Sequence, residues 1–490
     1  MPILISILAG VALSYSWNLH EGLLSTCFTF VSAALFCITS AQEKHAKKLS
    51  YLIGITSVAI AFSWLYATII RFGGFPSILA LGIFVLFVLG SALCFPIATH
   101  FHSSFKKHLS LLERFGILLP LCFVAVEKVP FVIFPWKWGH GILGVPQLTQ
   151  IADIGGASFL TFFVLVFGES IRQFRTNKKP TFLFLILFIA IWSYGTFSLK
   201  SFASSENNFL VSVVQANVSI ENKHNVAMFE DNLNRYIELS SSISKNSQLV
   251  IWPESVMTNW VPDSLSFKKD DPRMQNFPNG NFIFGALTFE SEDKYFNSAL
   301  GINSKGEVFR PYHKQILMPF GEFMPFSKRF PWVKLLNPVA ADFTAGLREE
   351  IFDFGNNIKA SPLICYEDIV PEMSARAVLA GATILVNITN DAWFGDTMAP
   401  YQHQRIAAFR AIENRRFLIR STNSGVTSII SPTGEVIKSL PTFSDGILET
   451  NVYPINSITW YSGLGAENVP HILFYLGVLG CLIQYFRRKF

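Results

Sequence analysis

Three polar residues lie at the ends of predicted strands and carry groups that could act together in one reaction. Glu254 lies in VIWPES, Lys314 in YHKQILMPFGE and Cys365 in SPLICYE. A carboxylate at a strand end is most often a cap or a solvated side chain, and a lone lysine is most often on the surface. Together, however, a thiol, a carboxylate and an ammonium are the groups that acyl transfer through a thioester requires.

Each of the three groups has a distinct task in such a reaction. A cysteine attacks as the thiolate, and a neighbouring cation lowers the pKa of the thiol. A carboxylate partly withdrawn from water is a better base. A fixed ammonium can stabilise the tetrahedral oxyanion, for which one good donor contributes ~3–4 kcal/mol.

The region that holds these residues alternates short apolar strands with polar helices. The pattern predicts helices over 226–243, 371–380 and 401–416. Val- and Ile-rich runs that end in turn residues are typical of strands. They are FLVSVVQANV, LVIWPES, FIFGALT, SALGINS, SPLICYED, ATILVNITND and VTSIISPTGEV. Such alternation predicts an α/β domain with a buried sheet.

The rest of the chain is too apolar to be a soluble domain. The 490 residues are 50% hydrophobic and 15% charged, whereas a soluble domain is about 25% charged. A membrane span needs ~20 mostly apolar residues. Candidate spans cover 2–17, 22–40, 51–70, 76–98, 115–136, 157–172, 181–199 and 469–486. We therefore expect an α-helical membrane bundle with eight transmembrane (TM) helices, seven within 1–200 and one within 467–490, together with an α/β domain at 201–466. The first stretch lacks the basic start of a signal peptide, and we expect it to be retained.

The charges of the short loops predict the orientation of these helices. The short loops that follow odd-numbered apolar stretches carry little positive charge beyond Arg71 and Lys137. Thirteen basic residues follow even-numbered stretches: Lys44, Lys47, Lys48, Lys106, Lys107, Arg114, Arg172, Arg175, Lys178, Lys179, Arg487, Arg488 and Lys489. By the positive-inside rule these loops and both termini are cytoplasmic, and residues 201–466 lie across the membrane. That region has a net charge of −5 and the rest of the chain one of +10, so the excess positive charge belongs to the apolar part and does not indicate nucleic-acid binding.

The cysteines agree with this placement. Only Cys365 lies in the exported region, so no disulfide can form within it. A free cysteine is usually a small buried core residue, but the surroundings of Cys365 favour a functional thiol. The others lie in predicted membrane helices: Cys27, Cys37, Cys94, Cys122 and Cys481.

Two charges, Glu127 and Lys128, interrupt the fifth apolar stretch. Charges at that depth usually face the bundle interior and often have a function. A neutralising pair that holds two helices together is an equal alternative, and the sequence leaves both open.

Seven stretches spread over the chain together carry a family resemblance. They are FPW at 134–136, PQLTQIADIGG at 146–156, WPES at 252–255, HKQILMPFGEFMPF at 313–326, ICYED at 364–368, NITNDAWFGDTMAPYQHQ at 387–404 and RAIENRRFLIRSTNSGVTSIISPTGEV at 410–436. Glu, Lys and Cys in this order resemble the nitrilase or carbon–nitrogen hydrolase superfamily. The whole chain resembles the apolipoprotein N-acyltransferases, membrane enzymes of bacterial lipoprotein maturation. The resemblance implies a nitrilase-like α-β-β-α sandwich on the periplasmic side of the inner membrane.

The resemblance also assigns roles to residues. It implies that Glu322 supports the lysine or the substrate amine, and that Glu367, with Tyr366 before it, is a required carboxylate. Ordinary loop and cap carboxylates are the alternative for Glu322 and Glu367. One position departs from the family pattern, because His224 stands where the family usually has Trp. The catalytic residues that it implies are Cys365 as nucleophile, Glu254 as general base and Lys314 as oxyanion stabiliser.

The implied reaction has two lipid substrates. Cys365 takes an acyl chain from a membrane phospholipid as a thioester, and the α-amino group of a diacylglyceryl-cysteine on an apolipoprotein then accepts it as an amide. We expect no cofactor, because the sequence has no Gly-rich phosphate loop. We expect no metal, because it has no HExxH and no paired CxxC. We also expect the protein to be a monomer that binds the lipid bilayer and does not bind nucleic acid.

Aromatic residues near the lysine suggest where lipid could bind. Phe323, Met324 and Phe326 belong to a Phe-rich stretch, and Trp393 and Phe394 lie in NDAWFG. Such segments could dip into the headgroup region and admit acyl chains. Packing in the core of the sandwich is the competing interpretation for both.

Two other functions are compatible with parts of the sequence. A membrane-tethered nitrilase-type amidase would hydrolyse a small amide or nitrile with the same three residues, but it would not need eight membrane helices. A transporter or receptor with a non-catalytic ligand-binding domain would not need Glu254, Lys314 and Cys365.

Overall fold

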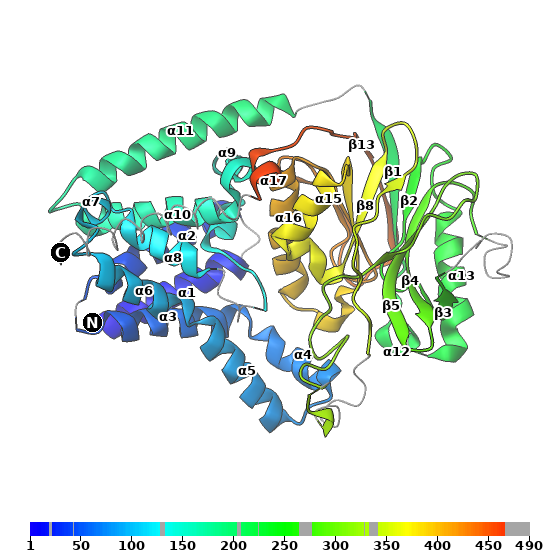
Figure 1. Cartoon of the computed structure of the whole chain (residues 1–490), viewed down its shortest axis with the longest axis horizontal. Helices are drawn as coiled ribbons and strands as arrows, with labels where there is room; N and C mark the ends of the chain where they lie inside the picture. The colour runs from blue at the N-terminus through cyan, green and yellow to red at the C-terminus, as the bar shows by residue number, and fades with distance from the viewer. Residues whose placement is uncertain are drawn as a thin grey trace, which may run out of the picture. The chain divides into compact units, whose positions relative to one another are not determined.

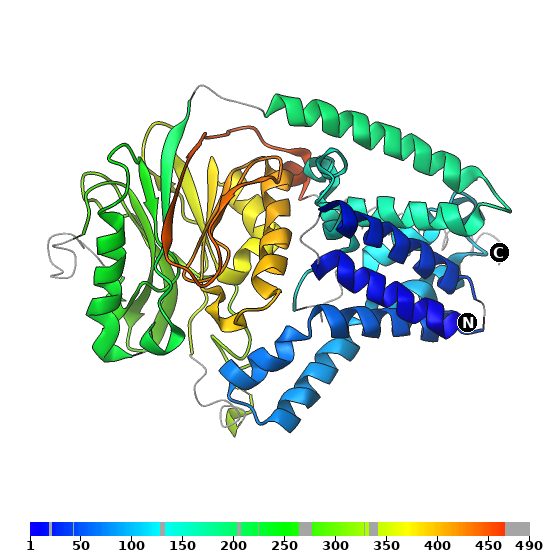
Figure 2. The same cartoon turned by 180° about the vertical axis from the view of Figure 1, so that it is seen from behind.

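The computed structural model describes residues 1–18, 22–42, 44–127, 133–202, 207–223, 225–263, 277–327, 329–332 and 342–465. The chain forms two compact units. The first contains Met1–Tyr66, Ile78–Ala203 and Thr459–Phe490, and the second contains Ala67–Ser77 and Ser204–Ile458. The helices of the first unit and the sheets of the second are drawn in Figures 1 and 2.

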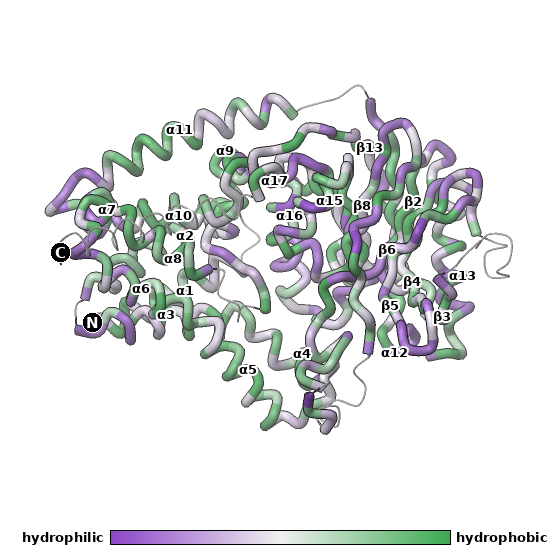
Figure 3. The backbone as a smooth tube through the Cα atoms, viewed as in Figure 1, coloured by the Kyte–Doolittle hydropathy of each residue, from purple (hydrophilic) through white to green (hydrophobic). Residues whose placement is uncertain are grey.

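The first unit is built from helices whose residues are mostly apolar, as the colouring of α5 and α11 shows (Figure 3). Helix α10 packs against α2, α8 and α11, and α1 packs against α2 and α3. The longer helices are α1 (Pro2–Asn18), α2 (Gly22–Ser40), α3 (Ala46–Ala61), α5 (Ser77–Ser91), α6 (Cys94–Phe105), α10 (Ala152–Gln173) and α11 (Lys179–Ser201). The shorter ones are α4 (Trp64–Gly73), which runs on into the second unit, α7 (Ser110–Arg114), α8 (Leu118–Val126), η1 (Trp138–Ile142), α9 (Pro146–Thr149) and α17 (Trp460–Leu464).

Within the described residues, four helices are long and apolar enough to cross a membrane. They are Gly22–Ser40, Ser77–Phe105, Ala152–Gln173 and Lys179–Ser201. A fifth span results if Ala46–Ala61 and Trp64–Arg71, which are bent by 55°, are taken together, and Pro2–Asn18 is a shorter apolar helix. Several apolar helices therefore form this unit, in agreement with the expected membrane bundle.

The expected span 115–136 does not form one long helix where the structure describes it. In the stretch 115–136 the described helix is α8, with only 9 residues. Gly116, with φ 69°, separates α8 from α7, and Glu127 lies at the other end of α8. The expected span 469–486 lies outside the described residues, as does Lys128. Glu127 accepts a hydrogen bond from Thr161 of α10 at 2.8 Å, so it contacts a neighbouring helix.

The second unit contains two sheets. The first has the strand order β13-β1-β2-β4-β5-β6, with β3 also paired to β4. Its strands are β1 (Phe209–Gln215), β2 (Leu249–Ile251), β3 (Met257–Pro262), β4 (Phe282–Ser291), β5 (Lys294–Ile302), β6 (Tyr312–His313) and β13 (Gly446–Val452). The parallel strands β1, β2 and β4 are short apolar runs, and β2 is buried along its whole length.

The second sheet has the order β12-β11-β10-β9-β8-β7. The central strands β8, β9 and β10 are parallel, and β9 and β10 are buried at every position. The strands are β7 (Phe352–Asp353), β8 (Lys359–Ile364), β9 (Ile384–Thr389), β10 (Leu418–Thr422), β11 (Ser428–Ile430) and β12 (Val436–Ser439).

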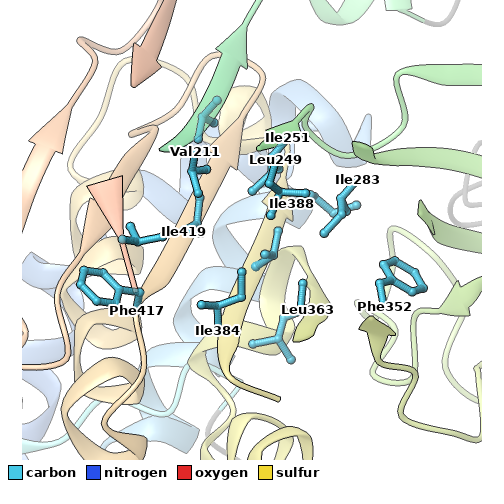
Figure 4. Close-up of a cluster of buried hydrophobic side chains, with 14 of the residues drawn as sticks. Val211, Leu249, Ile251, Ile283, Phe352, Leu363, Ile384, Ile388, Phe417 and Ile419 are labelled. Carbon is cyan, nitrogen blue, oxygen red and sulfur yellow. The ribbon is translucent and has the colours of Figure 1, made fainter. Parts of the chain in front are cut away.

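Helices cover the outer faces of the two sheets, which gives the expected α-β-β-α order (Figures 1 and 2). Helix α13 (Phe229–Ser240) lies on the first sheet, and α15 (Pro371–Leu379) and α16 (Ala399–Asn414) lie on the second. A buried apolar cluster fills the space between the sheets, with Val211, Ile283, Ile388 and Ile419 among its members (Figure 4). A second cluster, which includes Trp252, lies between the first sheet and α13. The predicted nitrilase-like layering is therefore confirmed.

The parallel strands also place the polar loops. Strands β1 and β2 run in one direction in the first sheet, and β8, β9 and β10 run in one direction in the second. The carboxyl ends of parallel strands meet at the same edge of a sheet, which is where ligands bind in many α/β proteins. The loops after β2 and β8 carry Glu254 and Cys365, whereas Lys314 and Glu322 follow β6. His224 lies outside the described residues.

Candidate active site

Cys365 follows β8 directly and begins the short helix η5 (Cys365–Ile369). Its backbone has φ 52°, in the left-handed region that residues other than glycine rarely adopt. Strain of this kind persists where the surrounding structure fixes it, and it is common at active sites. Here the side-chain amide of Asn387 on β9 donates to the carbonyl oxygens of Cys365 at 3.0 Å and Leu363 at 3.2 Å. The sharp turn therefore holds the thiol at the end of a buried strand.

Lys314 follows β6 and is held between two carboxylates. Its Nζ lies 2.8 Å from Oε2 of Glu322 and 3.8 Å from Oε1 of Glu254. The side chain is only 2% exposed, and its backbone N–H donates to the carbonyl of Asn297 at 2.8 Å. A buried ammonium must be paired to remain charged, and these two carboxylates are its partners.

Glu254 lies in the loop after β2 and is 6% exposed. The amide of Asn297 on β5 donates to Oε1 of Glu254 at 2.7 Å and to Oε1 of Glu322 at 2.9 Å. The loop lies directly on Gly285 of β4, because a Cβ at that position would be 2.6 Å from the Glu254 Cα. Two backbone hydrogen bonds fix the loop there. The Val256 N–H donates to the Gly285 carbonyl, and the Gly285 N–H donates to the Pro253 carbonyl.

The electrostatics of the site keep the resting thiol protonated. Burial raises the pKa of Cys365 well above that of a free thiol, and the charges of Glu254 and Asp391 raise it further. The charge of Lys314 and a hydrogen bond with Thr389 oppose this rise. The pKa of Lys314 is raised despite its burial, mainly by Glu322 and then by Cys365 and Glu254, so the lysine stays an ammonium. The thiol therefore needs a base. Among the acidic groups, Glu254 has the largest effect on the pKa of Cys365.

Glu322 and Glu367 have different surroundings. Glu322 pairs with Lys314 and also accepts a hydrogen bond from the Met318 N–H at 2.8 Å. Glu367 is fully buried, and its carboxylate accepts hydrogen bonds from one side chain and three backbone N–H groups. These donors are the Tyr312 hydroxyl at 2.8 Å and the N–H groups of Gln315 at 2.6 Å, Ile316 at 3.1 Å and Ile364 at 2.7 Å. Glu367 therefore joins the loop of the lysine to the turn of the cysteine.

Burial raises the pKa of both residues that follow the nucleophile. It raises the pKa of Glu367 to about 7, while the Ile364 N–H, Lys314 and the two other N–H groups oppose the rise. Tyr366 is partly buried, and this raises the pKa of its hydroxyl to about 12. Tyr366 is therefore a neutral hydroxyl over the physiological pH range.

The proposed lipid-contact residues differ in exposure. Phe326 is 76% exposed, Phe323 is partly buried and Met324 is buried. Trp393 and Phe394, in η6 (Asp391–Phe394), are partly buried. In the conformation described, Phe326 is the most accessible of the five.

Two features of the site were not predicted from the sequence. Asn297 bridges the two carboxylates, although nothing in the run YFNSALG distinguishes it from a polar residue on an exposed strand face. Behind the cysteine turn, His403 on α16 lies between two aspartates, with Nε2 2.6 Å from Asp368 and Nδ1 3.1 Å from Asp391. Arg420 on β10 donates to Asp368 at 2.9 Å. Among the described residues, no group of three His, Cys, Asp or Glu side chains is placed to hold a metal ion.

Comparison with known proteins identifies both units. The family model "Carbon-nitrogen hydrolase" matches residues 210–455, about half of the chain, and the model "Apolipoprotein N-acyltransferase N-terminal domain" matches residues 9–169. The apolipoprotein N-acyltransferase of Geobacter metallireducens is 30% identical over 482 residues, which cover 94% of this chain and 91% of that protein. That of Vibrio parahaemolyticus is 27% identical over 451 residues, which cover 89% and 88%.

A solved structure of Nit3 from Saccharomyces cerevisiae, a member of the nitrilase superfamily, aligns with 51% of this chain and 93% of its own, at 17% identity and a TM-score of 0.38. The match of the family model over residues 210–455 identifies the second unit as a carbon–nitrogen hydrolase domain, joined in one chain to an apolar helical unit. The chain belongs to the apolipoprotein N-acyltransferase family.

Proposed function

We propose that the protein transfers an acyl chain from a membrane phospholipid to the α-amino group of the N-terminal diacylglyceryl-cysteine of apolipoproteins. The reaction is ping-pong and passes through a thioester on Cys365. The observation that carries the proposal is the buried Glu254–Lys314–Glu322 cluster next to a strained cysteine, in a chain of this family.

In the first half-reaction, Glu254 takes the proton of the Cys365 thiol, and the sulfur attacks the ester carbonyl carbon of the phospholipid. The ammonium of Lys314, fixed by Glu322, stabilises the resulting oxyanion. The tetrahedral intermediate collapses by breaking the bond to the glycerol oxygen. That oxygen takes the proton from Glu254, and lysophospholipid leaves with the acyl chain still on sulfur.

In the second half-reaction, the α-amino group of the apolipoprotein attacks the thioester carbonyl. An α-amino group has a pKa of ~8, and only its neutral form is a nucleophile. Glu254 takes the proton that the nitrogen must lose as the amide forms. The carbon–sulfur bond breaks, and Glu254 returns the proton to Cys365. Water competes for the same thioester, so exclusion of water from the site favours transfer over hydrolysis.

The proposal includes the arrangement of the chain in the membrane. Residues 1–200 and 467–490 supply eight transmembrane helices of the bacterial inner membrane, with both termini in the cytoplasm. Residues 201–466 form the catalytic domain in the periplasm. The apolar helices of the first unit and the distribution of basic loops support this arrangement. The protein acts as a monomer without a cofactor.

The same proposal gives the aromatic segments a lipid-binding role. Phe326, which is exposed, and its neighbour Phe323 contact the acyl donor, and Met324 lines the path behind them. Trp393 and Phe394 form a second part of the pocket wall. The exposure of Phe326 on a loop close in sequence to Glu322 supports this role.

The test is to incubate the purified protein with phospholipid labelled in one acyl chain and to look for label on the protein. Wild type should accumulate an acyl group that neutral hydroxylamine releases, and Cys365→Ser should accumulate none. Transfer of the label to a diacylglyceryl-cysteine peptide should then follow. If wild type carries no acyl group but hydrolyses small amides, the protein is an amidase and the transferase proposal fails.

A further inference from the structure

A second buried lysine, Lys223, lies beside the site and has no role in the reaction described above. It ends the short helix α12 (Ile220–Lys223), which follows β1, and it is 6% exposed. Its Nζ donates a hydrogen bond to the backbone carbonyl of Glu254 at 2.7 Å. Among the described residues this carbonyl is its one hydrogen-bond acceptor, although an ammonium has three N–H groups.

The charges around Lys223 belong to the catalytic residues. Burial lowers the pKa of Lys223 to about 8, and the charges of Glu254 and Cys365 oppose that change. The elements packed against α12 are α13 and the short helix η2 (Val226–Met228), which has no charged residue. The charged side chains of α12 and α13 other than Lys223 are exposed: Glu221, Glu230, Asp231, Arg235 and Glu238. The charged groups with the largest effect on Cys365 are Glu254, Lys314 and Asp391, and Cys365 in turn acts on Lys223. Lys223 is therefore electrostatically coupled to the base and the nucleophile.

A count of charges shows what this coupling does. Glu254 and Glu322 are two negative charges beside the single positive charge of Lys314. Lys223 is a second positive charge and brings the sum of these four groups to zero. Asp391, which also acts on Cys365, has its own partners in His403 at 3.1 Å and Arg420 at 3.8 Å. Transfer of the thiol proton from Cys365 to Glu254 does not change the sum. Without Lys223, the thiolate would form in a buried site that already has an excess negative charge, which is costly at low dielectric.

We propose that Lys223 is a positioning residue that holds the backbone of Glu254 and supplies the second positive charge against which the Cys365 thiolate forms. The proposal rests on Cys365 as the nucleophile of the proposed function. It adds a second lysine to the three residues that the sequence pointed to.

Two substitutions separate the charge of Lys223 from its hydrogen bond. Lys223→Gln removes the charge and keeps an N–H donor for the Glu254 carbonyl, whereas Lys223→Arg keeps both. Lys438→Met is a matched control, because Lys438 on β12 also donates to a backbone carbonyl, that of Glu449 at 2.8 Å, but is exposed. The assay is the rate at which iodoacetamide alkylates Cys365 in the full-length protein at pH 7 to 10, with Cys365→Ala as the blank.

At pH 7, Lys223→Gln should be alkylated about tenfold more slowly than wild type, because a thiol pKa about one unit higher leaves a tenth of the thiolate. The difference should disappear towards pH 10, where the Lys223 of wild type, with a pKa of about 8, has lost its charge. Lys223→Arg and Lys438→Met should be alkylated at the wild-type rate at pH 7, and all variants should keep the melting temperature of wild type. Equal rates for Lys223→Gln and wild type at pH 7 overturn the proposal, whether or not the melting temperature falls. Acyl adducts from phospholipid are measured in the same preparations. Their absence in wild type would refute the proposed function without affecting the alkylation result.

Discussion

The placement of Glu254 depends on the absence of a side chain at Gly285. A Cβ built on Gly285 would lie 2.3 Å from the Ser255 nitrogen and 2.6 Å from the Glu254 Cα, and both are backbone atoms. Ordinary contacts of a Cβ begin near 3.4 Å, so Gly285→Ala must move the loop of Glu254 by roughly 1 Å. Such a movement lengthens the 2.7 Å hydrogen bond between Asn297 and Glu254 beyond the range of a good bond.

The expected effect on the rate follows from this displacement. A misplacement of ~1 Å in a catalytic group can cost about 100-fold in rate, which is ~2.7 kcal/mol in activation free energy. We expect Gly285→Ala to slow formation of the acyl-enzyme by about this factor. Overpacking also destabilises a fold by ~1–3 kcal/mol, so the melting temperature is measured alongside.

The assay is single-turnover acylation from labelled phospholipid, followed by acid quench and quantification of the thioester. The control is Gly446→Ala on β13, where a new Cβ would meet only the flexible end of Leu440, at 3.4 and 3.5 Å. This variant should acylate at the wild-type rate. If Gly285→Ala acylates as fast as Gly446→Ala, Glu254 does not need the position that the structure gives it, and its assignment as base is refuted.

Three further predictions concern the partners of the catalytic residues. Glu322→Gln removes the charge that holds Lys314, 2.8 Å away, and should slow acylation tenfold or more, since a hydrogen bond to a charged group contributes ~1.5–3 kcal/mol. Asn297→Leu removes the amide that bridges Glu254 and Glu322 and should slow single-turnover acylation by about 10- to 100-fold at an unchanged phospholipid KM. Because the pKa of Glu367 is about 7, its protonation as the pH falls below 7 should weaken its hydrogen bonds and lower the acylation rate. Glu367→Gln should give a low rate without that pH dependence.

The first two of these predictions have a control elsewhere in the same domain. Glu290→Gln breaks an exposed pair with Lys294, at 2.9 Å, and should leave acylation unchanged. Asn281→Leu removes a partly buried amide that donates to the Gln248 carbonyl and accepts from the Ser304 N–H, and it should also leave acylation unchanged. Wild-type acylation in Glu322→Gln or Asn297→Leu would contradict the roles assigned to them. A pH profile of Glu367→Gln that matches wild type would show that another group titrates.

The parts of the fold that could be predicted are those in which local pattern and tertiary environment agree. Strands such as β2 (LVI) and β9 (ILVNIT) are mostly apolar because they are buried on both faces. Glu254 follows β2, and Cys365 follows β8, which ends in the apolar residues Pro, Leu and Ile. Strand β10 was not predicted, because Arg420 stands in its middle. The structure buries that arginine completely and pairs it with Asp368, 52 residues away in the sequence.

The parts of the site that could not be predicted depend on contacts between distant segments. Asn297 meets Glu254 across 43 residues of sequence, and Lys223 meets the same glutamate across 31. Neither residue has a local pattern that marks it, because an Asn in a strand and a Lys at the end of a short helix are most often exposed. In the first unit, hydropathy indicated a span at 115–136. It could not show that the described helix there has only 9 residues, or that Glu127 at its end accepts a hydrogen bond from α10.

The thioester on Cys365 is the central claim, and peptide mapping by mass spectrometry tests it most directly. The protein is incubated with phospholipid of one defined acyl chain, digested and mapped, and a second aliquot receives a diacylglyceryl-cysteine peptide before digestion. The mechanism predicts that the mass of the acyl chain appears on the peptide containing Cys365, is removed by hydroxylamine, and is lost when the acceptor peptide becomes N-acylated. Formation of N-acylated acceptor by a protein that never carries the acyl chain on Cys365, or carries it on another residue, would contradict the mechanism.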